Sequence, residues 1–267
     1  MRERNSGILT TSIMLLFAAS TIYGQSAEPI DATVFQAAGP TASSIQSTID
    51  QYRAAFGGVN NGNIPGPLAE GRREINWDGG GSTATSPGPT PFDVFLSRGT
   101  RYITPGSGFV QAPASGLADT FGNASYANIF QTFSPVRLFS PVGSNITDVL
   151  FFVPGGATVP AVTRGFGVVL SDVDLPDGSG PGNKRGNRHA SSLIQYFAAD
   201  GSLLFSSFAP ASPGNGNLSF FGIVLDDPRI ARVRITTGNT APGPDDVANT
   251  DVVVMDDVIY GEPQPQP

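Results

Sequence analysis

Short apolar segments separated by turn-forming residues dominate the chain from residue 136 onward. They are rich in Val, Ile and Phe and are bounded by Gly, Pro, Asn, Asp or Ser, a pattern typical of β-strands. The segments that this pattern predicts as strands are 136–139, 148–153, 166–173, 193–198, 203–208, 218–225, 230–235 and 252–260. Between two of them, Asp200-Gly201 predicts a hairpin turn.

One segment follows a helical period instead. Ile45, Ile49, Tyr52 and Phe56 are spaced i, i+4, i+7 and i+11, which places them on one face of a helix. The pattern predicts a short amphipathic helix over residues 41–56, ended by two glycines and docked on the β-domain. Residues 25–40 before it show no periodicity, so we expect a flexible leader there.

Many strands with almost no helix indicate an all-β fold, and we expect a two-sheet β-sandwich of jelly-roll-like type. Strands and helices do not alternate along the chain, which argues against Rossmann and TIM-barrel architectures. We expect a single β-sandwich domain over residues 41–261, which includes the helix. Residues 262–267 (EPQPQP) read as a polar, proline-rich tail.

The N-terminus has the pattern of a secretory signal peptide. Arg2 and Arg4 precede an uncharged run at 8–20, and small and polar residues follow. Cleavage after residue 24 is expected, and a site as late as residue 27 also fits. The apolar run is too short to span a bilayer. We therefore expect a secreted, extracellular or periplasmic protein with no membrane span after the signal peptide is removed.

The composition argues against several classes of chemistry and binding partner. The chain has no cysteine, so it forms no disulfide and has no thiolate chemistry. Its formal net charge is −7. Lys184 is the single lysine, and binding to nucleic acid or to an anionic membrane requires clustered Lys and Arg. Neither partner is expected.

Carboxylates fall at unusual positions in two of the predicted strands. Asp172 and Asp174 continue the apolar face of one strand. Asp256 and Asp257 are adjacent within 252–260, a strand that is apolar on both faces. Alternation puts these two acids on opposite faces, so we expect at least one to be enclosed. Burying an unpaired carboxylate is costly, which predicts a cation or hydrogen-bond donors nearby.

Oxygen ligands from several strands suit Ca²⁺. A structural calcium site is therefore a hypothesis, with candidate ligands Asp172, Asp174, Asp256 or Asp257, and Asp78. The alternative is that these acids pair with arginines or accept backbone N–H bonds. The stretch 172–178 is not an EF-hand loop, because its third acid is one place late and no glutamate closes it.

The sequence contains no specific catalytic motif, and we assign no catalytic residue. With His189 as the single histidine and no cysteine, the usual zinc ligands are missing. His189 could act as a base for Ser191 or Ser192, but a solvated loop histidine is favoured because no orienting group or G-x-S-x-G motif exists. A carboxylate pair could serve a glycosidase.

Aromatic side chains that could stack on sugars are also present. The candidates are Trp77, Tyr102, Tyr126, Tyr196 and Tyr260. Residues of this type more often pack in a core or along a strand, and core packing is the favoured interpretation of each.

Five segments carry a resemblance to a known group of proteins: 73–79, 139–144, 152–155, 165–174 and 254–263. They resemble parts of uncharacterised exported bacterial proteins, some of which have a C-terminal PEP-CTERM sorting tail, and the similarity runs from about residue 45 to 263. The family implies no known activity. No hydrophobic helix or arginine cluster follows Glu262-Pro263 here, so release is expected rather than membrane retention.

The short motif Met255-Asp-Asp-Val258 is similar to the last strand of calcium-stabilised jelly rolls such as carbohydrate-binding modules and MAM domains. That likeness implies that one acid of the pair contacts the metal.

Taken together, these features predict a secreted, non-catalytic β-sandwich that acts as a surface or extracellular-matrix binding or structural component. Its expected partners are extracellular polysaccharide or cell-surface components. A carbohydrate-binding module in the strict sense is the first alternative, and a secreted hydrolase of unrecognised type is the second.

Overall fold

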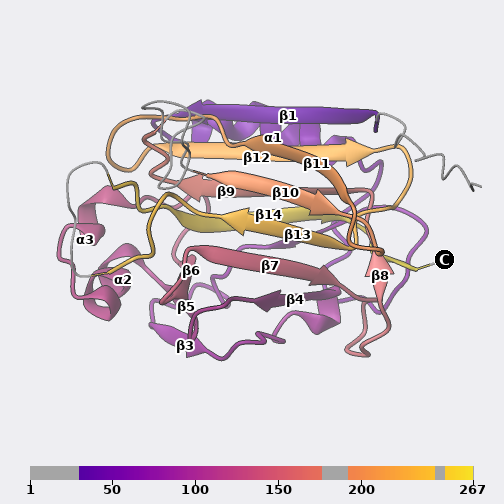
Figure 1. Cartoon of the computed structure of the whole chain (residues 1–267), viewed down its shortest axis with the longest axis horizontal. Helices are drawn as coiled ribbons and strands as arrows, with labels where there is room; N and C mark the ends of the chain where they lie inside the picture. Colours follow the sequence, from indigo (N-terminus) through magenta and orange to yellow (C-terminus); the bar gives the residue numbers. More distant parts are fainter. Residues whose placement is uncertain (1–29, 176–191, 244–249, 267) are drawn as a thin grey trace, which may run out of the picture.

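Two antiparallel sheets form the body of the protein (Figure 1). The computed structural model describes residues 30–175, 192–243 and 250–266. One sheet has eight strands in the order β1-β12-β9-β14-β6-β5-β3, with β2 also paired to β14, and the other has five in the order β11-β10-β13-β7-β4. The predicted all-β sandwich is confirmed. The predicted signal peptide, His189 and Ser191 lie outside the described residues.

The strands have the following bounds. In the eight-stranded sheet they are β1 Ala32–Gly39, β12 Leu218–Leu225, β9 Gly165–Ser171, β14 Val254–Gly261, β6 Leu138–Val142, β5 Gly108–Ala112, β3 Ser86–Gly88 and β2 Arg72–Ile75. In the five-stranded sheet they are β11 Leu203–Phe208, β10 Leu193–Phe197, β13 Arg232–Thr236, β7 Ile146–Phe151 and β4 Thr100–Ile103. A small third sheet pairs β15 Gln264–Pro265 with β8 Ala161–Val162.

All eight strands predicted after residue 136 are present as β6, β7 and β9 to β14. The predicted hairpin turn joins β10 to β11, and Gly201 takes a left-handed φ of 84° there. Its N–H donates to the Ala198 carbonyl at 3.0 Å. Most of these strands bury alternate residues between the two sheets, which explains why periodicity found them.

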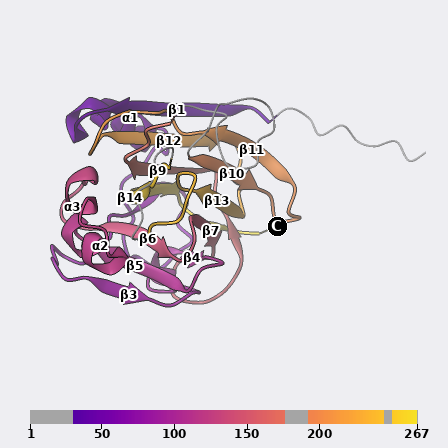
Figure 2. The same ribbon diagram turned by 60° about the vertical axis from the view of Figure 1, so that its left-hand side comes forward.

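The predicted helix is also confirmed. Helix α1 (Ala42–Ala54) runs over β1 and β12 on the outer face of the eight-stranded sheet, as Figures 1 and 2 show. Its apolar face packs against β9, β12 and β14, and Ile45, Ile49, Tyr52 and Phe56 are all buried. Tyr52 also contacts the rings of Phe35 and Phe220 edge-on.

Two further short helices were not predicted. They are α2 (Ala114–Phe121) and α3 (Tyr126–Ile129), and a 3-10 turn, η1, covers Leu96–Arg98. The apolar side chains of α2 and α3 pack on β5, β6 and the start of β14. Elements this short show too few helical periods to be recognised among turn-forming residues. Among the described helices, none combines the length and apolarity needed to cross a membrane.

The expectation of a flexible leader over 25–40 is wrong for residues 32–39, which form strand β1. The strand pairs with β12 along its whole length, from Ala32 opposite Leu225 to Gly39 opposite Leu218. It lies at the edge of the sheet and has no fully buried residue: Phe35 and Ala37 on one face are partly buried, and Val34, Gln36 and Ala38 on the other face are exposed. Its residues are mostly small or polar, so the sequence lacks the apolar pattern that identified the other strands.

The first residue of the predicted polar tail, Glu262, is anchored to the domain. Glu262 is buried and forms a bidentate ion pair with the fully buried Arg73, with both N–O distances at 2.7 Å. Asn61 Nδ2 and the Leu68 backbone N–H also donate to the Glu262 carboxylate, at 2.8 and 3.1 Å. The Arg73 guanidinium donates further to two backbone carbonyls of the 62–64 loop. This network fastens loop 57–71 to the end of β14.

We predict that Arg73→Met lowers the free energy of unfolding by about 3–5 kcal/mol, because it leaves the Glu262 carboxylate buried without its partner. Urea denaturation at neutral pH measures the loss. As a control, Arg101→Met breaks a more exposed pair with Asp93 and should cost less than about 1 kcal/mol. Equal losses in the two variants would contradict the assignment.

Candidate functional site

Strand β14 contains a β-bulge at its two adjacent acids. Its register with β9 shifts between Met255 and Val258, so that Asp256 and Asp257 together oppose the single residue Val169. Met255 and Val258 consequently both face the core between the sheets. The prediction that the two acids lie on opposite faces is wrong, because a bulge breaks the alternation on which it rested.

Both carboxylates contact the same loop. The backbone N–H of Phe133 donates to Asp256 Oδ2 at 2.5 Å, and Ser134 Oγ donates to Asp257 Oδ1 at 2.6 Å. Besides burial, the charge of one carboxyl group raises the pKa of the other, so the two acids are electrostatically coupled. Oδ1 of Asp256 is buried and has no hydrogen-bond partner among the described residues. The bulge therefore creates a buried acid pair at the centre of the sheet.

Asp78 joins the acid pair at this loop. Asp78 Oδ1 accepts the backbone N–H groups of Val136 and Arg137 at 2.6 and 2.9 Å, and Ser134 Oγ lies 3.3 Å from Asp78 Oδ2. Trp77 takes a left-handed φ of 63°, which is rare for a bulky residue. Its indole N–H donates to the Asp256 carbonyl at 2.7 Å. The turn at Trp77 thus joins the bulge to Asp78.

The other two candidate calcium ligands lie elsewhere. Asp172 follows the end of β9, and its N–H donates to the Asn217 carbonyl at 2.9 Å. Asp174 Oδ1 accepts the N–H of Gly214 at 2.8 Å. The structure thus divides the five acids into two groups, each with hydrogen-bond donors from the chain. Within the described residues, no three or more His, Cys, Asp or Glu side chains are grouped so as to hold a metal ion.

Burial perturbs both members of the acid pair. Desolvation raises the pKa of Asp256 well above its usual value, and repulsion from the Asp257 charge raises it further. Desolvation also raises the pKa of Asp257, to about 6, against the opposing effect of the Ser134 hydrogen bond. Both carboxyl groups are more than nine-tenths buried, so the pair is a structural feature without access for a substrate.

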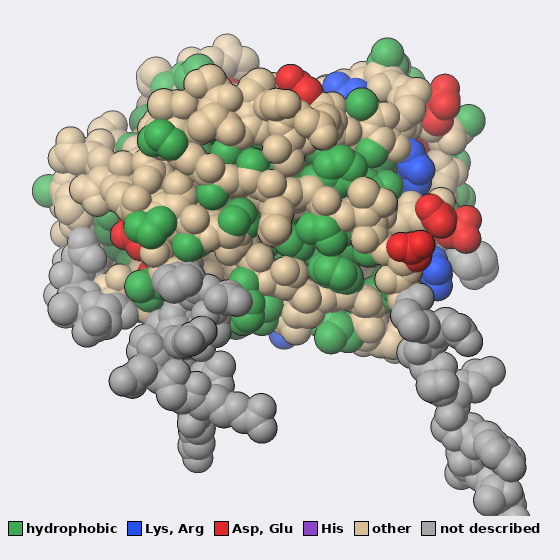
Figure 3. Space-filling view, turned by 90° about the horizontal axis from the view of Figure 1, so that it is seen from above, with side chains coloured by type: hydrophobic (Ala, Val, Ile, Leu, Met, Phe, Trp, Pro, Cys, Tyr) green, Lys and Arg blue, Asp and Glu red, His purple; other side chains and the backbone are tan. Residues whose placement is uncertain are grey.

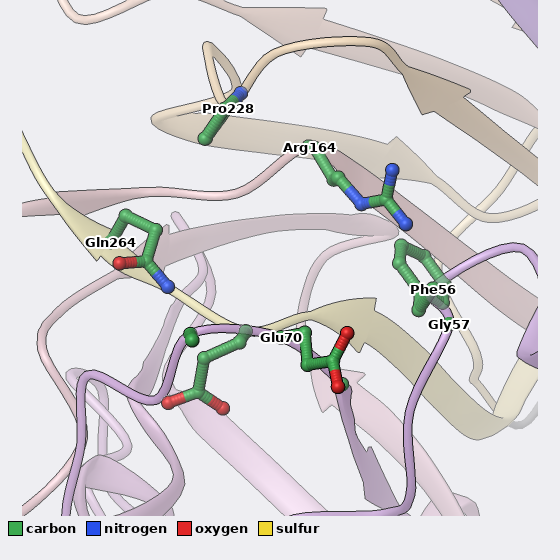
Figure 4. A pocket seen from close by; sticks show the side chains of 9 residues that line it. Phe56, Gly57, Glu70, Arg164, Pro228 and Gln264 are labelled. Atoms are coloured by element: carbon green, nitrogen blue, oxygen red, sulfur yellow. The ribbon is translucent and has the colours of Figure 1, made fainter.

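A cavity of about 370 Å³ lies at one end of the sandwich, and we call it the end pocket (Figure 4). It is formed by the end of α1, loop 57–71, the turn between β8 and β9, Pro228 and the segment after β14. The residues that line it are Phe56, Gly57, Ala69, Glu70, Gly71, Arg164, Pro228, Glu262 and Gln264. These positions come from distant parts of the sequence, and no periodicity or spacing connects them.

Arg164 is held at the pocket by the end of helix α1. Its Nη2 donates to the carbonyl of Ala55, the C-cap residue of that helix, where a cation is favourable. Its guanidinium also lies over the Phe56 ring, 5.4 Å from the centroid. Phe56 itself rests on the backbone of Gly165 and Gly261, where a Cβ atom would approach the ring to 2.9 Å. The remaining Arg164 N–H groups have no acceptor among the described residues.

Two hydrogen-bond acceptors complete the polar lining. The Glu70 side chain is exposed and has no hydrogen bond or ion pair within the described parts of the chain. Gln264 Nε2 donates to the Leu68 carbonyl at 2.7 Å, which leaves its amide oxygen available. The Glu262 carboxylate is fully engaged by Arg73. Figure 4 shows Arg164, Glu70 and Gln264 approaching the hollow from different sides.

The aromatic residues considered for sugar stacking are all buried, which agrees with core packing. They are Trp77, Tyr102, Tyr126, Tyr196 and Tyr260, each at most 1% exposed. Trp77 stacks on Phe139 with ring centroids 3.8 Å apart. Ser192, one of the two serines considered for nucleophilic catalysis, is buried as well, and its Oγ accepts the N–H of Gly238.

No protein-family model, curated protein or solved structure matches this chain.

The acid pair predicts an unusual dependence of stability on pH. The carboxyl groups of the pair bind a proton more tightly in the folded chain than in the unfolded chain. Their contribution to the free energy of unfolding is therefore complete at pH values below the ordinary pKa of 3.8. This stabilising contribution is lost as the pH rises through about 6 and above. Asp256→Asn keeps an acceptor for Phe133 and removes one titratable carboxyl group from the buried pair. We expect this variant to gain about 1–3 kcal/mol at pH 8 over the wild type, and to show a flatter stability profile from pH 5 to 8.

Denaturation at several pH values measures this effect. Asp200→Asn is the control, because hydrogen bonds from Ser202 lower the pKa of Asp200 and its neutralisation should not stabilise the protein at pH 8. A wild-type stability that rises steadily from pH 5 to 8, unaltered in Asp256→Asn, would refute the assignment.

The calcium hypothesis stays a prediction, now with two separate candidate positions. It predicts that millimolar Ca²⁺ raises the melting temperature and that Mg²⁺ at the same concentration does not, since Mg²⁺ demands a stricter octahedral site. A melting temperature that is the same in excess EDTA and in Ca²⁺ would exclude the hypothesis.

Proposed function

We propose that this chain is an exported, non-catalytic β-sandwich that binds extracellular polysaccharide and holds one sugar unit in the end pocket. The observation that carries the proposal is the presence of unused donors and acceptors around a cavity of about 370 Å³. A volume of this order suits a small ligand. Export rests on the signal peptide predicted from the sequence.

The electrostatics of the pocket favour a neutral ligand. Arg164 and Glu70 carry opposite charges and form no ion pair with each other. Arg73 neutralises Glu262, so the lining has no net charge. A sugar hydroxyl both donates and accepts hydrogen bonds, and it can therefore use the guanidinium, the carboxylate and the Gln264 amide oxygen. The Phe56 and Pro228 side chains add apolar surface for the ring carbons.

The pocket supports binding over hydrolysis. Glycosidases need two carboxyl groups that act on either side of the scissile bond. The end pocket contains two acids, but the Glu262 carboxylate accepts four hydrogen bonds from the chain and is buried. Glu70 is then the single carboxylate open to a ligand there.

We predict that a screen of immobilised neutral glycans identifies a ligand, and that Glu70→Gln and Arg164→Gln each weaken its binding about tenfold or more. Each substitution removes a charged hydrogen-bonding group, which contributes about 1.5–3 kcal/mol. Titration calorimetry with the ligand from the screen measures the dissociation constants.

Arg229→Gln is the matched control, because Arg229 is exposed at the same end of the sandwich and does not line the pocket. Binding in that variant should equal the wild type, and thermal melting should show all three variants folded. A glycan bound with equal affinity by all the variants would place the site elsewhere, and release of reducing sugar from it would contradict the non-catalytic assignment.

A further inference from the structure

A second cavity, of about 300 Å³, lies on the outer face of the five-stranded sheet, and we call it the sheet pocket. It is formed by the end of β7, the start of β13, the turn between β10 and β11 and the segments next to β8 and β15, which meet at one end of the sandwich (Figure 1). None of its lining residues belongs to the end pocket, so the two cavities are separate. A volume of this size suits a small ligand.

Most of the lining of the sheet pocket is apolar. Leu150, Phe152 and Ala231 are among the residues that contribute carbon surface, and the lining includes no acid. Asp200, in the adjacent turn, does not line the cavity, and its carboxylate accepts hydrogen bonds from the Ser202 N–H and Oγ at 2.9 and 2.6 Å. A ligand that fills this cavity therefore needs an apolar body.

Strand alternation brings one guanidinium to this apolar surface. Val233 in β13 faces the core, so Arg232 faces outward, beside Leu150 of β7 and Phe197 of β10. Its guanidinium carbon lies 3.8 Å from the centroid of the Phe197 ring, and its Nη1 donates to Asp148 Oδ1 at 3.0 Å. The ring and the carboxylate fix the guanidinium before any ligand binds, which reduces the entropic cost of binding.

One positive charge is left over beside the sheet pocket. Asp148 is shared by two arginines, and Arg234 forms the bidentate contact with it, at 2.9 and 2.7 Å. The other N–H groups of Arg232 have no acceptor in the part of the chain that the structure describes. Arg101, on the neighbouring strand β4, is neutralised by Asp93. On the β1 side of the molecule, by contrast, basic side chains lie beside acidic ones (Figure 3). The sheet pocket therefore complements a single negative charge.

We propose that the sheet pocket binds a monocarboxylate with a compact apolar body, and that the carboxylate pairs with Arg232. A carboxylate matches the planar fork of a guanidinium. Gln266 also lines the cavity, where its backbone N–H donates to the Pro160 carbonyl at 3.2 Å, and its amide can donate to the same carboxylate. A dianion such as sulfate would bring a second, unpaired charge to an apolar surface, which is unfavourable. A neutral sugar would leave most of its hydroxyl groups without partners there.

Calorimetric titration of the exported chain with benzoate tests the proposal. We expect saturable binding with a dissociation constant of about 1 mM or lower. Benzyl alcohol lacks the charge, acetate lacks the apolar body and sulfate carries a second charge, so each should bind at least about tenfold more weakly than benzoate. Arg232→Gln should weaken benzoate binding by about tenfold or more. Arg229→Gln is the matched control, because it removes the same charge from an exposed position outside both pockets, and its affinity should equal that of the wild type.

Thermal melting establishes that both variants are folded, and the comparison of the four ligands on the wild-type chain tests the proposal without any variant. A dissociation constant for benzoate above about 1 mM would overturn the proposal. So would benzyl alcohol or acetate that binds as tightly as benzoate, or benzoate affinity that is the same in Arg232→Gln and Arg229→Gln. The proposal does not rest on sugar binding by the end pocket, since the two pockets share no lining residue.

Discussion

Burial of charge along strand β14 is the constraint on which the rest of the structure depends. Every residue of this strand is buried, since β2, β6 and β9 pair with it and side chains pack on both faces. The sequence nevertheless places two carboxylates in its middle and a third, Glu262, directly after its end. Each must be supplied with hydrogen-bond donors, because an unsatisfied buried charge would outweigh much of the stability of a domain.

The two parts of β14 meet this requirement differently. At the centre, the bulge turns both acids toward the 133–134 loop, where Phe133 and Ser134 each donate to one carboxyl group and burial raises the pKa of both acids. At the end, Arg73 neutralises Glu262 outright. The Glu262 carboxylate has a further role, because it also accepts hydrogen bonds from Asn61 and from the Leu68 backbone N–H. Loop 57–71 is thereby fixed against the sheet, and the wall that carries Glu70 in the end pocket is formed.

The predictable part of the fold consists of elements with a clear apolar pattern. The helix stripe from Ile45 to Phe56 and strands β7, β10 and β13 have one buried and one exposed face. Strands β9, β12 and β14 are buried throughout, and their unbroken apolar segments between turn-forming residues identified them instead. Strand β1 has no fully buried residue and consists mostly of small or polar residues, and α3 is a single turn, so neither gives a clear apolar pattern. For the site, the sequence singled out Asp78, Asp256 and Asp257, which do meet. It grouped them with Asp172 and Asp174, which lie elsewhere, and it missed the end pocket.

The sequence by itself determined the all-β class, the helix on the sheet, the absence of disulfides and the presence of acids in strands that must be buried. Hydrophobic periodicity and composition are local properties, and they do not depend on which strands become neighbours. Only the tertiary structure decided that Asp256 and Asp257 share one face and that Glu262 belongs to the core. It also decided which side chains surround the end pocket. These outcomes depend on one extra residue in a strand pairing and on contacts between segments up to about two hundred positions apart, such as Asn61 with Glu262, and no local pattern encodes them.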